Sequence, residues 1–295
     1  MKLIAVILFV ALSGIAFGQN VTNQFGGQPS FAGQLISAVP SAAAIPYPLL
    51  LDLNPDLGVF SDAGTTPATN TGIIIQWNDQ SGNGYNFSGG TTLETNIANG
   101  HSVVRFLASA LGGGTGNSMA NTTLVHPCPL VVFLVMATSS SDWSLGETIY
   151  SSPISSSTPS LGGADFGYGT PHLNAMSAGN PGLIPATAFP TSGFNLITIS
   201  WAVSSINIRL NGIDIGSSSG GTSVGFNGLV INPSFLSYCD IARFAISTNA
   251  SLSSVTNIEN VLMTNYITGS VSLNYLLDPN GLTIFDPAGN PIISL

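Results

Sequence analysis

Acidic residues are the first candidates for chemistry, because a retaining glycoside hydrolase needs two carboxylates held about 5 Å apart. The three glutamates, Glu94, Glu147 and Glu259, each lack a second acid within three residues. The histidines, which stand in no catalytic motif and are expected to cap turns or face solvent, are His101, His126 and His172. The sequence therefore predicts a protein that is not an enzyme.

Two polar loops could instead hold a calcium ion. The loop "SDAGTTPATN" carries Asp62, and the loop "WNDQSGNGYNF" carries Asp79. Calcium prefers several carboxylate and carbonyl oxygens supplied by a loop. Asp79, Ser81 and Asn83 place an oxygen at every second residue. Calcium is thus one reading of these loops, with Asp62 and Asp79 as its candidates, and no other cofactor is expected.

The same residues also predict a tight turn, which is the reading we favour. An aspartate in a turn accepts backbone N–H bonds, and glycines supply positive φ. A second turn lies in "INIRLNGIDIG", where a type I′ hairpin needs positive φ at both central residues. The residues assigned to structural turns are Asp79, Gly82, Asn83, Gly84, Asn211 and Gly212.

Aromatic side chains on loops could stack on sugar rings, because a flat apolar face suits them. The Ser- and Gly-rich stretch 139–170 offers three such candidates for glycan contact: Trp143, Tyr150 and Tyr168. Packing in a core or an interface is the alternative role for each.

The elements that must position these residues are mostly strands. Short β-type runs bounded by Gly, Pro, Asn and Ser clusters fill most of the chain. "LVVFLVMA" is apolar on both faces, which predicts a central strand between two layers. From Ser253 to Ile267, apolar residues recur at steps of three and four, which predicts one amphipathic helix.

The order of these pieces resembles concanavalin A-like, laminin-G-like jelly-roll domains of bacterial secreted and phage proteins. The stretches that carry the likeness are "DAGTTPAT", "WNDQSGNG", "VVRF", "IRLNGIDIG" and "DIARFAISTNASLSSVTNIENVLMTNYI". The resemblance covers residues 47–268 and implies an all-β, two-sheet antiparallel jelly-roll sandwich with one short C-terminal helix. Asn265 stands where the family usually has lysine. The fold alone implies little about function.

Four segments are expected. Residues 1–18 read as a secretory signal peptide, with Lys2, an apolar run and an Ala16-Phe17-Gly18 cleavage site. Residues 19–46 form an N-terminal arm, 47–268 the jelly-roll domain and 269–295 a β-meander tail with two Asp-Pro-x-Gly turns. After the signal peptide no membrane span is expected, because the longest apolar run has the length of a strand.

Charge narrows the choice of partners. The chain has 13 acidic residues against 4 basic ones and a net charge of −9. Its only lysine, Lys2, lies in the signal peptide. Without a basic patch, nucleic acid is not an expected partner.

The two cysteines are not expected to form a disulfide. In an exported protein an even count suggests a bridge. However, Cys128 and Cys239 each precede a strand, 129–137 and 241–247. If these strands are antiparallel neighbours, their starting ends lie more than about 20 Å apart, beyond the reach of a disulfide.

Two functions follow from these patterns. The first is a secreted, non-catalytic jelly-roll module that binds a neutral glycan or a surface protein partner. The alternative is a structural subunit of a surface layer, appendage or virion that self-assembles through the sandwich and the tail. Low charge and the strand-rich tail favour the second, and the loop aromatics favour the first.

Overall fold

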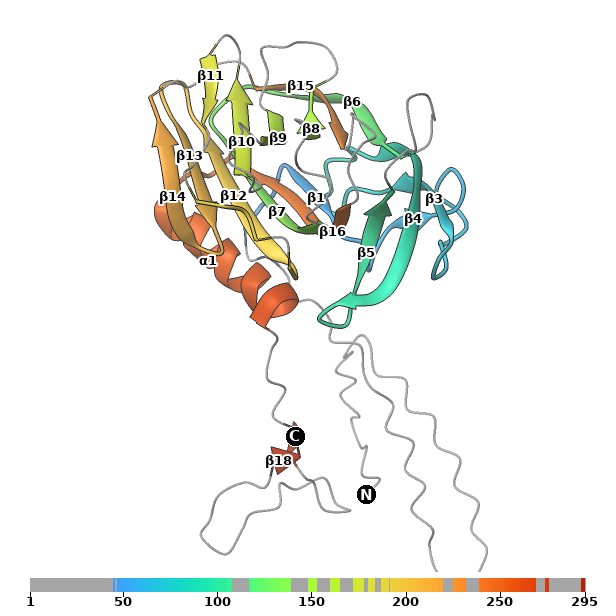
Figure 1. The fold of residues 1–295 in the computed structure, drawn as a ribbon. Coiled ribbons are helices and arrows are strands. Elements are labelled where there is room, and N and C mark those ends of the chain that lie inside the picture. Colours follow the sequence, from blue (N-terminus) through green and yellow to red (C-terminus); the bar gives the residue numbers. More distant parts are fainter. Residues whose placement is uncertain are drawn as a thin grey trace, which may run out of the picture. The chain divides into compact units, whose positions relative to one another are not determined.

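The computed structural model describes residues 45, 47–107, 117–138, 148–152, 160–164, 172–177, 180–183, 187–190, 192–219, 225–231, 239–268, 274–275 and 293–294. Eighteen strands and one helix occur in this part of the chain (Figure 1). The first nine strands are β1 (Leu51–Leu53), β2 (Val59–Phe60), β3 (Ile73–Trp77), β4 (Phe87–Ala98), β5 (His101–Phe106), β6 (Met119–His126), β7 (Leu130–Thr138), β8 (Thr148–Ser151) and β9 (Ser160–Ala164). The others are β10 (His172–Ser177), β11 (Asn180–Leu183), β12 (Asn195–Trp201), β13 (Ile206–Leu210), β14 (Ile213–Ser218), β15 (Phe226–Ile231), β16 (Cys239–Ser247), β17 (Asn274–Tyr275) and β18 (Ile293–Ser294). The helix α1 (Leu252–Met263) continues into a π-helical turn, η2 (Thr264–Thr268).

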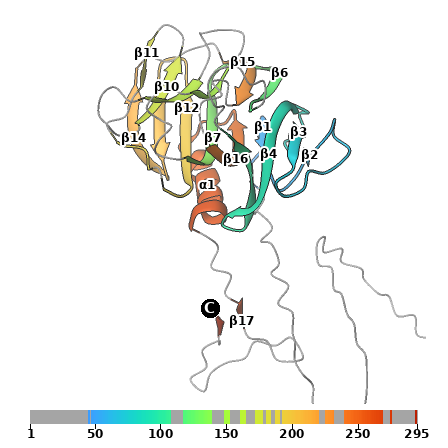
Figure 2. The same cartoon turned by 45° about the vertical axis from the view of Figure 1, so that its right-hand side comes forward.

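Sixteen strands form one hydrogen-bonded antiparallel sheet that folds over on itself. Its main path runs β11-β10-β9-β8-β15-β6-β4-β5-β16-β7-β12-β13-β14, with β1 paired to β16 and β2–β3 attached to β4. The two ends of the path approach each other, since β11 lies near β14 (Figures 1 and 2). The result is the predicted two-layer, all-β jelly-roll sandwich.

Contacts between strands that are distant in the path show where the layers meet. Tyr150 on β8 packs edge-on against Phe244 on β16, with ring centroids 5.5 Å apart. It also packs against Phe226 on the neighbouring β15, at 6.0 Å. Around them lies one continuous apolar core, which includes the buried indoles of Trp77 and Trp201.

The central strand β7 is apolar on both faces because both are covered, as its sequence predicted. Leu130, Val132 and Leu134 belong to the sandwich core, whereas Val131 and Phe133 belong to a second apolar cluster. Residues of α1 and the π-helical turn complete that second cluster: Val255, Ile258, Leu262 and Tyr266. The helix therefore covers the outer face of the sheet that contains β7.

Local signals located the hairpin and the helix correctly. Asn211 and Gly212 have φ of 49° and 77° between β13 and β14, as a type I′ turn requires. The side chain of Ser251 caps α1 by accepting a hydrogen bond from the backbone N–H of Ser254. The last residues of the predicted helix form the π-helical turn instead of an α-helix.

In the tail, β17 pairs antiparallel with β18 as a separate two-stranded sheet. The two Asp-Pro-x-Gly turns, like the arm up to residue 44, lie outside the described residues. Within those residues, no helix combines the length and the apolar character that crossing a bilayer would require.

Strand direction also decides the position of the thiols. Strands β7 and β16 are antiparallel, and Cys239 pairs with Thr138 at the far end of β7. Cys128 precedes the near end, so the length of β7 separates the two residues by more than about 25 Å. No disulfide joins them, as predicted.

Close approach of two backbones gives a test of the fold. A Cβ on Gly89 in β4 would lie 1.9 Å from the carbonyl oxygen of Ser118. We expect Gly89→Ala to lower the free energy of unfolding by at least about 2 kcal/mol, because the strands must separate. Gly82 has open space but φ of +90°, so Gly82→Ala should cost only about 1 kcal/mol. Urea denaturation of both variants measures the difference, and equal losses would contradict this packing.

Candidate functional site

A pocket of about 370 Å³ opens where the chain enters the sandwich. Three segments line it: the stretch around β1, the turn that follows β3, and β16. The lining residues are Ile45, Tyr47, Pro48, Leu49, Asp52, Asn54, Leu57, Gln80, Ser81 and Arg243. One wall is thus apolar and aromatic, and the rest is polar.

Strand alternation places Asp52 on the side of the sheet away from the sandwich core. In β1, Leu51 and Leu53 are completely buried in that core. Asp52 lies between them and points to the opposite face. It pairs with Ala245 of β16, which belongs to the cluster under the helix.

A β-bulge places Arg243 on the same side. The register of β16 with β7 shifts between Ile241 and Arg243, so Ala242 is an extra residue. A bulge moves the alternation of side chains by one position. Ile241 and Phe244 therefore both face the sandwich core, while Arg243 is kept out of it.

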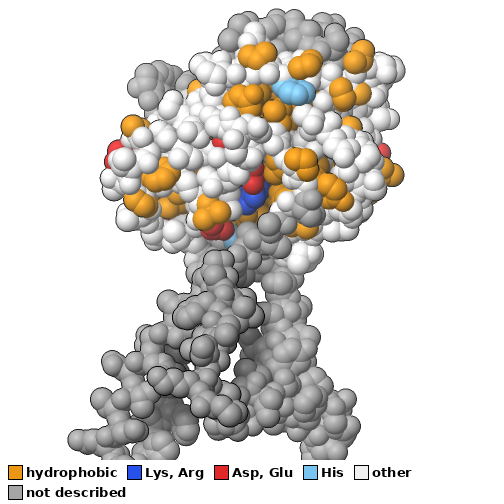
Figure 3. Space-filling model, turned by 180° about the vertical axis from the view of Figure 1, so that it is seen from behind, with side chains coloured by type: hydrophobic (Ala, Val, Ile, Leu, Met, Phe, Trp, Pro, Cys, Tyr) orange, Lys and Arg blue, Asp and Glu red, His pale blue; other side chains and the backbone are white. Residues whose placement is uncertain are grey.

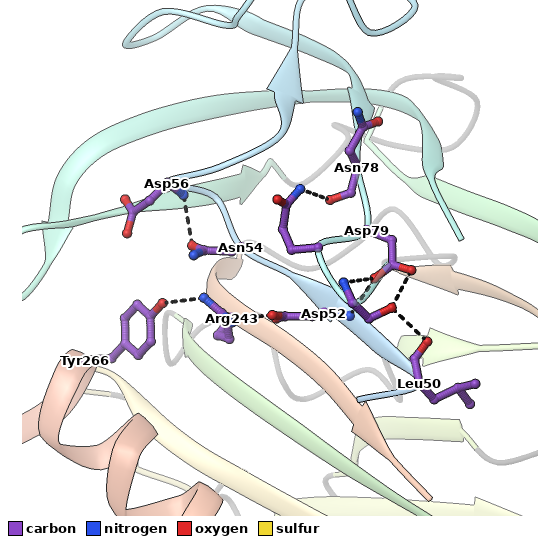
Figure 4. Close-up of polar contacts among 10 residues, drawn as sticks. Leu50, Asp52, Asn54, Asp56, Asn78, Asp79, Arg243 and Tyr266 are labelled. Carbon is purple, nitrogen blue, oxygen red and sulfur yellow. Dashed lines mark hydrogen bonds and ion pairs between the residues drawn. The ribbon is translucent and has the colours of Figure 1, made fainter. Parts of the chain in front are cut away.

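Arg243 and Asp52 form a buried ion pair at the pocket (Figure 4). Arg243 Nη2 donates to Asp52 Oδ2 at 2.7 Å, and Nη1 donates to the Tyr266 hydroxyl at 3.3 Å. Burial raises the pKa of Asp52 above its ordinary value, against the opposing effect of the Arg243 charge. Asp52 Oδ1 and Arg243 Nε are buried and make no hydrogen bond within the described part of the chain.

The other two arginines make complete ion pairs. Arg105 donates from Nε and Nη2 to both oxygens of Asp240, at 2.7 and 2.8 Å. Arg209 does the same to Glu259, at 2.9 and 3.0 Å. Of the three arginine pairs, all within the described residues, the pair at the pocket alone leaves a buried donor and a buried acceptor without partners. Such groups cost stability unless something satisfies them.

The predicted turn around Asp79 builds one wall of this pocket. Asp79 Oδ1 accepts from the backbone N–H groups of Asp52 and Ser81, both at 2.9 Å. Its Oδ2 accepts from the Ser81 hydroxyl at 2.7 Å and from the N–H of Tyr85 at 3.2 Å. Asn83 Nδ2 donates to two carbonyl oxygens just before β1. The turn is thereby fastened to the pocket entrance, with Gly82 and Gly84 at positive φ.

The carboxylates of the calcium candidates accept hydrogen bonds from nearby N–H and hydroxyl donors. Asp62 accepts three backbone N–H bonds and the Thr65 hydroxyl within its own loop. These bonds, of which those from Thr66 contribute most, lower the pKa of Asp62. Among the described residues no cluster of three His, Cys, Asp or Glu side chains could hold a metal ion.

Of the three aromatic candidates for glycan contact, the structure describes only Tyr150. Tyr150 is completely buried in the sandwich core, so its ring cannot meet a sugar at the surface, and its selection as a contact was wrong. Tyr150 lies in a Ser- and Gly-rich stretch, whose composition indicated a loop where the structure has the short strand β8. Trp143 and Tyr168 lie outside the described residues.

Of the histidines, His101 differs from the expectation that it would cap a turn or face solvent. His101 is buried, with 1% of its surface exposed, and its Nδ1 lies 2.6 Å from Asp56 Oδ2. His126 Nδ1 contacts the carbonyl oxygen of Pro127 at 2.7 Å near the surface. His172 begins β10.

Two serines stand in G-x-S-x-G matches, Ser218 in "GSSSG" and Ser223 in "GTSVG". A nucleophilic serine of this motif sits between a strand and a helix. Ser218 ends β14, and the next element is the strand β15. Ser223 lies outside the described residues.

The pocket residues were not among the candidates chosen from the sequence, although two of them stand out in it. Asp52 in "LLLDL" and Arg243 in "IARFAIS" are single charges inside apolar strands. A buried charge needs a partner, so each could have been expected to pair. Arg105 in "SVVRF" and Arg209 in "INIRL" give the same signal, so the sequence alone does not decide which arginine meets Asp52. Tyr47, Asn54 and Tyr266 gave no such signal.

No family model matches the chain, and no characterised protein matches it by sequence. Solved structures share its fold. They include the binding domain of botulinum neurotoxin DC in complex with rat synaptotagmin II, with a TM-score of 0.53 and 14% identity over 81% of this chain and 55% of that one. A structure of botulinum neurotoxin type C, whose cell entry depends on interaction with two ganglioside molecules, has a TM-score of 0.51 and 14% identity over 80% of this chain and 55% of that one. An arabinofuranosidase complexed with arabinofuranosyl-alpha-1,2-xylobiose has a TM-score of 0.51 and 11% identity, over 78% and 62%.

At these identities the likeness is one of fold. The chain spans little more than half the length of the toxin domains that it matches. These structures support the β-sandwich that the sequence resemblance implied, and the concanavalin A-like family remains a prediction.

We expect Asp79→Ala to lower the free energy of unfolding by roughly 1 to 2 kcal/mol, because four donors lose their acceptor. Asp62→Ala is the matched control and should cost less, since Asp62 accepts bonds only from its own loop. Calcium or a chelator should leave the melting temperature of the unmodified protein unchanged. A calcium-dependent rise that is lost in Asp79→Ala would establish the metal site instead.

The pKa of Asp56 predicts a dependence on pH. Burial raises this pKa, but hydrogen bonds with His101 and Ser102 outweigh burial and hold it below its ordinary value. A lowered folded pKa stabilises the protein above the unfolded pKa of about 4 and loses that effect as the pH falls further. The stability difference between the unmodified protein and Asp56→Asn should therefore shrink below about pH 4. Urea titrations at several pH values measure it, and a difference that grows with acid would refute the assignment.

Proposed function

We propose that the protein is a secreted, non-catalytic binding module that holds a neutral glycan in the pocket around Asp52 and Arg243. The incomplete ion pair is the observation that carries this proposal. A purely structural pair would gain by closing both hydrogen bonds, as the other two arginines do. Here one acceptor and one donor of the pair have no hydrogen-bond partner, and a ligand in the adjoining pocket could bond to both.

A hydroxyl group matches what the pair lacks. Asp52 Oδ1 can only accept and Arg243 Nε can only donate, and a hydroxyl does both. One ligand hydroxyl, two adjacent ones, or a water that the ligand holds in place can therefore satisfy both atoms. The pocket volume of about 370 Å³ lies at the small end for ligand sites and suits one or two sugar rings.

The opposite wall suits the apolar face of a sugar. The ring of Tyr47 is half-buried, and Asn257 holds its hydroxyl with a 2.7 Å hydrogen bond. Two other residues that line the pocket are also accessible: Pro48 is exposed, and Leu57 is 55% exposed. An amphipathic pocket of this kind favours a ligand with both C–H faces and hydroxyls over a purely ionic one.

Local charge favours a neutral ligand. Arg243 is balanced by Asp52, and the negative charge of Asp79 lies close enough to raise the pKa of Asp52. Among the described residues that line the pocket, no unpaired positive charge remains to attract an anionic sugar. The remaining arginines are held in their own ion pairs.

Lack of catalysis is supported by how the described acids are used. Glu94 and Glu259 contact arginines, and Asp79 is fully occupied by donors. Toxin binding domains and a sugar-complexed arabinofuranosidase share the fold, which makes carbohydrate a reasonable ligand class without deciding between binding and hydrolysis.

Self-assembly into a surface layer, appendage or virion is the second candidate function. Large apolar side chains are exposed, including Ile73 at 63%, Val125 at 61% and Ile213 at 69%. Figure 3 shows hydrophobic groups spread over one face with few charges between them. Sedimentation at increasing protein concentration tests this role, because assembly would raise the mass and a monomer would not.

Neutral-glycan screening followed by calorimetric titration tests the binding role. Lactose and arabinofuranosyl-xylobiose serve as neutral probes, and sialyllactose is the anionic counterpart of lactose. We expect binding of a neutral glycan that weakens at least about tenfold, or ~1.4 kcal/mol, in Tyr47→Ala, Asn54→Ala and Arg243→Lys. Arg105→Lys is the matched control, because it alters an ion pair away from the pocket, and it should retain affinity.

The opposite results would overturn the proposal. The first is the absence of binding to any neutral glycan, and the second is that the pocket variants bind as tightly as the unmodified protein. The third is turnover of a bound oligosaccharide, which would make the protein an enzyme.

A further inference from the structure

A buried set of side chains lies behind the pocket and connects two of its lining residues. We propose that Tyr266 is a positioning residue, which fixes the guanidinium of Arg243 for the ligand. This inference rests on the proposed function of the pocket. Tyr266 does not line the pocket and is only 2% exposed, so it would act through Arg243.

The π-helical turn supplies the tyrosine. Helix α1 ends at Met263, and Tyr266 lies in the π-helical turn Thr264–Thr268. Its hydroxyl accepts from Arg243 Nη1 at 3.3 Å (Figure 4). Single π-helical turns frequently occur at functional sites, and here the turn carries a tyrosine that hydrogen-bonds the pocket arginine.

Two contacts hold the guanidinium at separate nitrogens. Asp52 accepts from Nη2 and Tyr266 accepts from Nη1. With one contact alone, the guanidinium could rotate about the bonds of its long side chain. With both, the plane of the group is fixed and Nε–H keeps one direction. A fixed donor binds a ligand hydroxyl without first losing rotational freedom.

Tyr266 is itself held from behind. The ring of His101 packs on it, with centroids 4.7 Å apart and planes tilted by 51°. His101 Nδ1 lies 2.6 Å from Asp56 Oδ2, and Asp56 Oδ1 accepts from the N–H of Ser102 at 2.8 Å. The backbone N–H of Asp56 donates to Asn54 Oδ1 at 3.0 Å.

These contacts return to the pocket, because Asn54 lines it as Arg243 does. The order is Arg243, Tyr266, His101, Asp56 and Asn54.

The Nε–H groups of arginine give a direct test, because the chain has only three arginines. Nuclear magnetic resonance of the arginine-¹⁵N-labelled protein should show three such signals, and Arg243→Lys identifies the one of interest. In Tyr266→Phe we expect the Nε–H of Arg243 to shift and to exchange with solvent at least about fivefold faster, because its side chain regains motion. The signals of Arg105 and Arg209 should not change.

Controls separate positioning from general loss of structure. Tyr150→Phe removes a buried hydroxyl elsewhere and should leave all three signals unchanged. Asp56→Asn should disturb the same Arg243 signal through His101 and Tyr266, and it replaces Tyr266→Phe if that variant fails to fold. An unchanged Arg243 signal in a folded Tyr266→Phe protein, or equal changes at all three arginines, would overturn the positioning role.

The measurement needs no ligand, so it fails independently of the proposed function. If a neutral glycan binds but the Nε–H signal of Arg243 does not change in Tyr266→Phe, the positioning inference is wrong and the binding function stands. If no glycan binds while the signal responds, the binding function is wrong, and Tyr266 holds Arg243 for the fold alone.

Discussion

The structure depends on how a chain with very few cations holds its arginines within the strands of the sheet. An arginine in an apolar interior is costly unless a carboxylate and further hydrogen bonds accompany it. Each arginine meets this requirement by joining distant parts of the chain: β5 to β16, β13 to α1, and β16 to β1. These carboxylates thereby tie strand to strand and helix to sheet, and the pair between β16 and β1 borders the pocket described above.

Sequence reasoning succeeded where the deciding interactions are local. The two covered faces of β7, the Asn211-Gly212 hairpin and the apolar stripe of α1 can each be read from neighbouring residues, and all three are present. The pocket could not be read in this way. Its ion pair joins positions 191 residues apart, and the bulge at Ala242 that turns Arg243 outward has no Gly or Pro to mark it. Tyr150 was misjudged because composition alone indicated a loop.

The turn "WNDQSGNG" shows how an architectural device can also shape a site. Asp79 fastens the turn to the backbone of Asp52, and Asn83 fastens it to the carbonyl groups just before β1. Gln80 and Ser81 then form part of the pocket wall. This segment is therefore a structural turn that also forms part of the pocket wall. It does not supply the charged pair.

The confinement of every arginine to a paired strand has a consequence for proteolysis. Beyond Lys2, the only bonds that trypsin can cleave follow Arg105, Arg209 and Arg243, and these lie within β5, β13 and β16. A protease must draw an extended segment into its cleft, which a hydrogen-bonded strand resists until it opens. Loops, the usual sites of nicking, offer this enzyme nothing to cut. Tryptic cleavage of this protein would therefore report the opening of the sheet itself.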